Sequence, residues 1–147
     1  MRTLPRFALV AALGVLCTPA FGLDYRAAAG PAILYDSPSA SGKKLFIVSA
    51  GTPLEVVVTL EKWIKVRDRD GKLAWIARPD LADYQSVMVT RDKATIHAQA
   101  DDDAPTVFTA SQGVVLRVSG PAKGSWLPVR HADGESGFVR RVDVWGY

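Results

Sequence analysis

The chain has 147 residues, of which 48% are hydrophobic and 22% are charged, a globular balance that argues against a disordered protein. Its formal net charge is +3, from 18 basic and 15 acidic residues. Two of the basic residues, Arg2 and Arg6, lie in a segment that we expect to be removed, which leaves 16 against 15 and a net charge of about +1. A nucleic-acid binder needs a concentrated basic excess, so nucleic acid is not an expected partner.

The first 22 residues have the layout of a secretory signal peptide. The two arginines precede an apolar run over residues 7–17, which Pro19 ends. Ala20 and Gly22 then supply the small residues that a signal peptidase requires. We therefore expect cleavage after Gly22, so that residues 1–22 are the signal and the mature protein begins at Leu23.

Two other uses of this segment fit its residues less well. A membrane anchor is disfavoured because the apolar run is too short to cross roughly 30 Å of hydrocarbon as a helix. Lipid attachment at Cys17 is disfavoured because the bulky Leu16 precedes it. Cys17 is the only cysteine, so the mature chain has neither a disulfide nor a thiol nucleophile. We expect an exported protein without a transmembrane anchor.

The mature chain shows the pattern of an all-β protein. It has no helical periodicity of useful length, and its apolar runs are short, rich in β-branched and aromatic residues, and separated by turn residues. An Asp-Gly pair at residues 70–71 has the chemistry of a tight hairpin turn. The expected strand-forming runs cover residues 32–35, 45–48, 54–60, 63–66 and 73–76.

An internal repeat divides the mature chain into two modules. Each pair of matching segments is separated by 62 or 63 residues, and their order is preserved. The sequence therefore predicts two tandem modules, residues 23–84 and 85–147, which sit against each other because no Gly/Ser linker separates them. The matches are 51–56 with 113–118, 63–67 with 126–130, 70–71 with 133–134, 74–76 with 137–139, and 80–81 with 143–144.

The ordered pattern resembles the bacterial SH3-like (SH3b) domains. In the first module it comprises Gly51, Val56, the Trp63–Arg67 segment, the Asp-Gly pair and the Ala-Trp-Ile segment at 74–76. The resemblance implies two small, partly open β-barrels of about five strands each, in a bacterial protein that is periplasmic or secreted. Such domains are similar in binding peptidoglycan, peptides or partner proteins, and the barrel itself is not catalytic.

The strand predicted at Trp63–Arg67 places a candidate binding surface. Side chains alternate between the two faces of a strand, so Ile64 and Val66 point into the barrel while Trp63, Lys65 and Arg67 point outward. An exposed tryptophan beside two cations suits stacking and contact with anions. Covering a loop or packing on the neighbouring module are alternative roles for such a ring.

The second module repeats this arrangement, with Trp126, Pro128 and Arg130 expected outward and residues 127 and 129 inward. In the family alignment Tyr35 would flank the groove beside Trp63, and His97 stands at the matching position of the second module. We expect Trp75 to lie in the core, next to Ile76. The candidate ligand-binding residues are thus Tyr35, Trp63, Lys65, Arg67, Trp126 and Arg130.

No cofactor, metal or catalytic site is expected. His97 and His131 lack a paired ligand spacing, and the acidic run at 101–103 lacks the glycine and glutamate of a calcium loop. No activated nucleophile is recognisable, so we expect no enzyme.

Two functions remain open. The first is recognition of a cell-wall peptide or peptidoglycan by an aromatic groove at Trp63 and Tyr35. The second is a role as an adaptor or structural partner in an envelope complex, with the outward tryptophans, Trp145 and Tyr147 buried against another protein.

Overall fold

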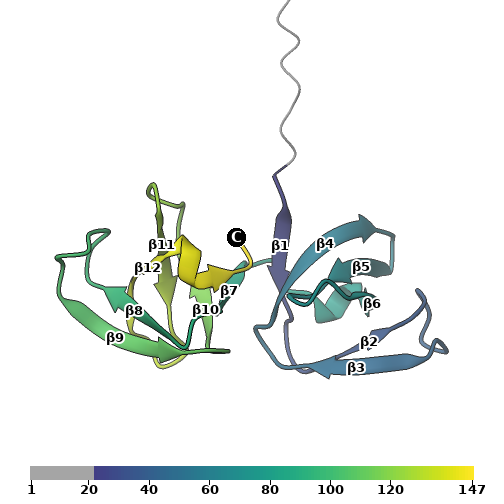
Figure 1. Ribbon diagram of the computed structural model, residues 1–147. Coiled ribbons are helices and arrows are strands. Elements are labelled where there is room, and N and C mark those ends of the chain that lie inside the picture. Colours follow the sequence, from purple (N-terminus) through teal and green to yellow (C-terminus); the bar gives the residue numbers. More distant parts are fainter. Residues whose placement is uncertain (1–21) are drawn as a thin grey trace, which may run out of the picture.

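The computed structural model describes residues 22–147, which form two tandem all-β modules (Figure 1). This confirms the predicted fold class and the repeat. The expected signal peptide lies, apart from Gly22, outside the described residues. Within the described part of the chain, no helix is long and apolar enough to cross a membrane.

The first module is a six-stranded antiparallel sheet that curls around its own core. The strand order is β1-β4-β5-β6-β2-β3, followed by a single short 3₁₀ turn, η1, at Arg78–Asp80. Strand β1 was not among the runs predicted from sequence, because its residues are not a continuous apolar run. The strands are β1 Asp24–Ala27, β2 Ala32–Tyr35, β3 Lys44–Val48, β4 Pro53–Thr59, β5 Trp63–Arg67 and β6 Leu73–Ala77.

The second module repeats this plan with a seven-stranded sheet in the order β13-β7-β10-β11-β12-β8-β9. Its extra strand, β13, comes from the C-terminus and pairs with β7. A 3₁₀ turn, η2, at Arg141–Asp143 precedes β13. The strands are β7 Ser86–Val89, β8 Lys93–His97, β9 Thr106–Ser111, β10 Val115–Val118, β11 Trp126–Arg130, β12 Ser136–Arg140 and β13 Val144–Trp145.

Each module has its own apolar core, formed by alternate residues of its strands. In β5, Ile64 and Val66 are fully buried, and in β11 Leu127 and Val129 occupy the matching positions. The predicted inward faces of both strands are therefore confirmed. The two cores are small, and each is completed by a partly buried phenylalanine, Phe46 in the first module and Phe108 in the second.

The predicted hairpin turns also form. Gly71 and Gly134 adopt φ values of +84° and +102°, a region that residues with a Cβ rarely enter. The carboxylate of Asp68 accepts hydrogen bonds from the backbone N–H groups of Asp70 and Lys72, which closes the first of these turns.

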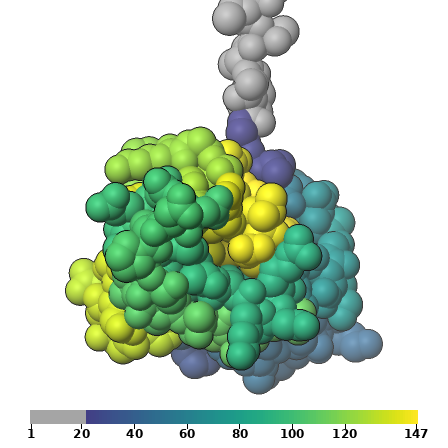
Figure 2. Space-filling view, turned by 60° about the vertical axis from the view of Figure 1, so that its left-hand side comes forward, coloured from purple at the N-terminus to yellow at the C-terminus, as the bar shows by residue number. Residues whose placement is uncertain are grey.

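The two modules pack against each other, as the missing linker predicted. The ring of Tyr25 in β1 meets that of Trp145 in β13 edge to face, with centroids 5.3 Å apart. Ser86 donates a hydrogen bond to the carbonyl oxygen of Gly51 at 2.6 Å. Figure 2 shows the yellow C-terminal residues between the green second module and the blue first module.

Candidate functional site

An aromatic surface lies on the outer face of the first module, where β5, β6 and β2 run side by side. In the strand register, Trp75 of β6 lies opposite Lys65 of β5 on one side and opposite Tyr35 of β2 on the other. Trp63 lies opposite Ala77, whose small side chain leaves space above β6. The rings of Tyr35 and Trp63 meet across this space edge to face, with centroids 5.4 Å apart. We call Tyr35, Trp63 and Trp75 the first-module aromatic surface.

Trp75 corrects one sequence-based prediction. It was expected in the core, but its ring is half-buried on the outer face, where the Lys65 ammonium lies 5.7 Å from the ring centroid. The inward positions of β6 are taken by Ala74 and Ile76. Since Ile76 points inward, strand alternation requires its neighbour Trp75 to point outward, whereas the prediction had placed both residues in the core.

In the second module the matching tryptophan is covered. Trp126 occupies the same position on β11 as Trp63 on β5, yet it is only 6% exposed. The ring of His97 meets it edge to face at 5.2 Å. The guanidinium of Arg140 lies over it, 4.5 Å from the ring centroid. The expectation that Trp126 offers an open outward ring is therefore wrong, because strand alternation gives the face of a side chain but not what covers it.

The cover is a fixed ion pair. Arg140 donates from Nε to the Asp102 carboxylate at 3.0 Å, from a second nitrogen to the same carboxylate, and from Nη1 to the hydroxyl of Ser125. A guanidinium bound to both carboxylate oxygens is well oriented and resists displacement. Arg140 is thus held over the indole of Trp126.

The first module lacks both members of this pair. The register places Ala77 opposite Trp63 and Arg140 opposite Trp126.

The two loops that follow β2 and β8 also match. The Ser39 N–H donates a hydrogen bond to the carbonyl two residues before it, and the Asp101 N–H does the same. The residue after each is therefore equivalent, which makes Ala40 the counterpart of Asp102. Two alanines replace the ion pair, and for this reason Trp63 remains partly open.

Arg67 does not join the first-module aromatic surface. Its guanidinium pairs with Glu55 of β4 at 3.2 Å, and the Glu55 side chain is buried. Tyr25 lies next to this pair, and its pKa is raised, first by burial and then by the Glu55 carboxylate. Arg67 therefore points toward the contact between the modules, so the predicted pair of rim cations reduces to Lys65.

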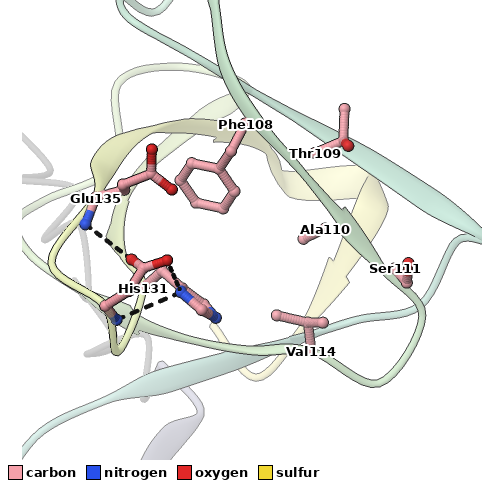
Figure 3. A pocket seen from close by; sticks show the side chains of 8 residues that line it. Phe108, Thr109, Ala110, Ser111, Val114, His131 and Glu135 are labelled. Carbon is pink, nitrogen blue, oxygen red and sulfur yellow. Dashed lines mark hydrogen bonds and ion pairs between the residues drawn. The ribbon is translucent and has the colours of Figure 1, made fainter.

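Arg130 also lies away from the aromatic rings, at the hollow between the modules that His131 borders. Figure 3 shows the other side of His131, where its ring faces a smaller hollow together with Phe108. His131 Nδ1 lies 2.9 Å from the carboxylate of Asp133. The pKa of Asp133 is lowered, first by a hydrogen bond from the Glu135 backbone N–H and then by His131.

The two C-terminal aromatic residues act within the molecule. Trp145 packs on Tyr25 between the modules. Tyr147 packs on the second core, with the Arg141 guanidinium 4.5 Å from its ring centroid. Neither ring therefore extends an outer partner surface, as the adaptor hypothesis had assumed. Among residues 22–147, no group of three His, Cys, Asp or Glu side chains could hold a metal ion.

The profile of the bacterial SH3 domain family matches the chain twice, over residues 28–83 and 91–146. No curated protein matches the sequence. Among solved structures, the chain is similar to NlpC2 from Trichomonas vaginalis, with 7% identity and a TM-score of 0.38, over 84% of this chain and 48% of that one.

Two further structures have comparable scores. NlpC1 from Trichomonas vaginalis shares 8% identity at a TM-score of 0.37, over 92% of this chain and 50% of that one. An NlpC/P60 family protein from Bacillus cereus shares 14% identity at a TM-score of 0.39, over 84% of this chain and 56% of that one. The chain thus spans about half the length of these structures.

Proposed function

Since the chain belongs to the bacterial SH3 domain family, we propose that it is an exported, non-enzymatic binding protein whose first module recognises a cell-wall peptide of peptidoglycan. The observation that carries this proposal is the contrast between the two equivalent tryptophans. Trp63 remains partly open, whereas Trp126 is 6% exposed beneath a guanidinium. A ring that stays partly open on the outer face of a barrel is available to contact a ligand, which is the role we assign to Trp63.

The chemistry of the surface favours a peptide with free carboxylates. The open indole and the Tyr35 phenol offer flat apolar faces of the kind that anchor peptides. Lys65, Lys62 and Lys44 lie on or next to these strands, and none of them forms an ion pair within residues 22–147. Unpaired lysines beside an aromatic surface attract an anionic partner and orient it.

The test is co-sedimentation of the mature protein, residues 23–147, with purified peptidoglycan. We expect Trp63→Ala to weaken binding by about 2 kcal/mol or more, a roughly thirtyfold loss, as for an aromatic anchor at the centre of an interface. Lys65→Gln should weaken it less, and only at low salt, because an exposed charge acts mainly over a Debye length of about 10 Å.

Two controls accompany this measurement. Val142→Ala truncates a side chain that is 68% exposed on the second module, and it should leave binding unchanged. Circular dichroism of each variant reports whether the barrels are intact. If Trp63→Ala and the wild-type protein sediment equally with peptidoglycan, the first-module aromatic surface is not the binding site.

An adaptor role is the second candidate, and one observation favours it. Strand β3 is an edge strand of the first sheet, and it exposes Leu45 and Ile47, the latter by 71%. An exposed apolar edge can pair with a strand of another protein. Affinity capture from envelope extract, with Ile47→Lys as the matched control, separates the adaptor role from peptidoglycan binding. Loss of the captured protein with unchanged sedimentation would support the adaptor role.

A further inference from the structure

A second candidate site lies in the hollow between the two modules, and its composition differs from that of the aromatic surface. The cavity measures about 460 Å³, a size that accommodates a small ligand. Ala50 and Gly51 of the first module form one wall. Arg117, Arg130 and His131 of the second module form another, and no aspartate or glutamate lines the cavity.

The two arginines are directly opposite each other on neighbouring strands. Arg117 of β10 pairs in register with Arg130 of β11, so their side chains leave the same face of the sheet. Like charges at directly opposite positions destabilise a sheet. Both side chains are exposed, and neither forms an ion pair within residues 22–147. The Arg117 guanidinium is instead stacked on the ring of Tyr84, 4.1 Å from its centroid.

The first module shows how this position is built when it serves stability. There the equivalent pair across β4 and β5 is Glu55 and Arg67, which form an ion pair at 3.2 Å. The second module has an arginine where the first has the glutamate. The substitution replaces an attraction by a repulsion at the edge of a cavity, and a bound anion would remove that repulsion.

We propose that Arg117 and Arg130 form an anion-binding site between the modules, specific for a carboxylate or phosphate group. Two guanidinium groups present planar, paired donors that match the oxygens of such a group. The stacking of Arg117 on Tyr84 fixes one guanidinium in advance, which lowers the entropy cost of binding. The hollow is bordered by both modules, so an occupant contacts both and stabilises their docking.

This inference does not depend on the proposed function, because none of the cavity residues belongs to the first-module aromatic surface. The experiment is a nuclear magnetic resonance titration of mature protein with inorganic phosphate and, separately, with succinate. Sodium chloride at equal ionic strength is the reference. We expect saturable shifts of the backbone amides of Tyr84, Ser86 and Ala132 with at least one of the two anions. The more effective anion identifies the group that the site prefers.

Three variants make the result decisive. Arg117→Glu recreates the ion pair found in the first module, and Arg130→Gln removes one of the two guanidinium groups. Each substitution should weaken anion binding about tenfold or more. Arg91→Gln, which removes an exposed arginine elsewhere on the second module, should bind as the wild-type protein does. The saturating anion should also raise the melting temperature of the wild-type protein but not that of Arg117→Glu.

Other results would overturn the proposal. Shifts that match those in sodium chloride would mean that only ionic strength acts. Equal affinity in the wild-type protein and Arg117→Glu would show that the opposed arginines do not hold the anion. Sedimentation with peptidoglycan should be unaffected by Arg117→Glu, so the two proposals fail separately.

Discussion

The two equivalent tryptophans should differ in their contribution to stability. A buried aromatic side chain removes about 150–250 Å² from water, which at about 25 cal/mol per Å² corresponds to roughly 4–6 kcal/mol. Trp126 is buried at 6% exposure and also carries the Arg140 guanidinium. We therefore expect Trp126→Ala to cost about 3–5 kcal/mol, the usual range for a buried aromatic residue.

Trp63→Ala should cost less, about 2–3 kcal/mol by the same conversion, because its ring is half-buried and Ala77 leaves the space beside it open. Within the same strand, Ile64→Ala should cost about 2–5 kcal/mol, since that side chain is fully buried. Chemical denaturation of the mature protein gives the free energies of unfolding. Amide hydrogen exchange of β5 and β11 assigns each loss to a module.

Equal losses for the two tryptophan variants would refute the reasoning, because the ion-pair cover would then add nothing to burial. A larger loss for Trp63→Ala than for Ile64→Ala would show that Trp63 belongs to the core. Either result would remove the basis for treating the first-module aromatic surface as a binding site.

Three further expectations concern the fold and its export. A Cβ added at Gly137 would lie 2.5 Å from the carbonyl oxygen of His97. Gly137→Ala should therefore lower the free energy of unfolding of the second module by about 2 kcal/mol or more, as measured by denaturation. The pKa of Tyr25 in the folded protein is raised above 10.0. Its contribution to the free energy of unfolding is therefore complete below pH 10.0 and is lost as the pH rises through the folded-state pKa. Tyr25→Phe should abolish that alkaline loss of stability in a series of denaturation measurements. Mass spectrometry of the exported protein should find Leu23 as its first residue, and a retained apolar run would contradict the signal assignment.

The barrel interiors were predictable because alternation is a local property of a strand. Ile64 and Val66 point inward because their neighbours point outward, and the repeat places Leu127 and Val129 in the same way. The hairpin at Gly71 follows equally from two adjacent residues. None of these features depends on which distant segment lies alongside.

The candidate site was only partly predictable, because its accessibility depends on distant pairings. Asp102 and Arg140 are 38 residues apart in the chain, and only the folded register places them over Trp126. The pairing of Arg67 with Glu55 across β4 and β5 has the same origin. A usable signal was nevertheless present: in the repeat alignment, Ala77 of the first module stands where the second has Arg140.

The most direct test of the account transfers the cover to the first module. Ala40→Asp combined with Ala77→Arg places the ion pair over Trp63, and Lys62→Ser supplies the counterpart of Ser125 without disturbing a core position. The account predicts that this triple variant keeps a folded barrel and loses sedimentation with peptidoglycan to the same extent as Trp63→Ala, while Lys62→Ser alone retains most of it. Acrylamide should also quench its tryptophan fluorescence less than in the wild-type protein. Full sedimentation by a triple variant whose Trp63 has become protected from acrylamide would contradict the central claim that the open ring binds the wall.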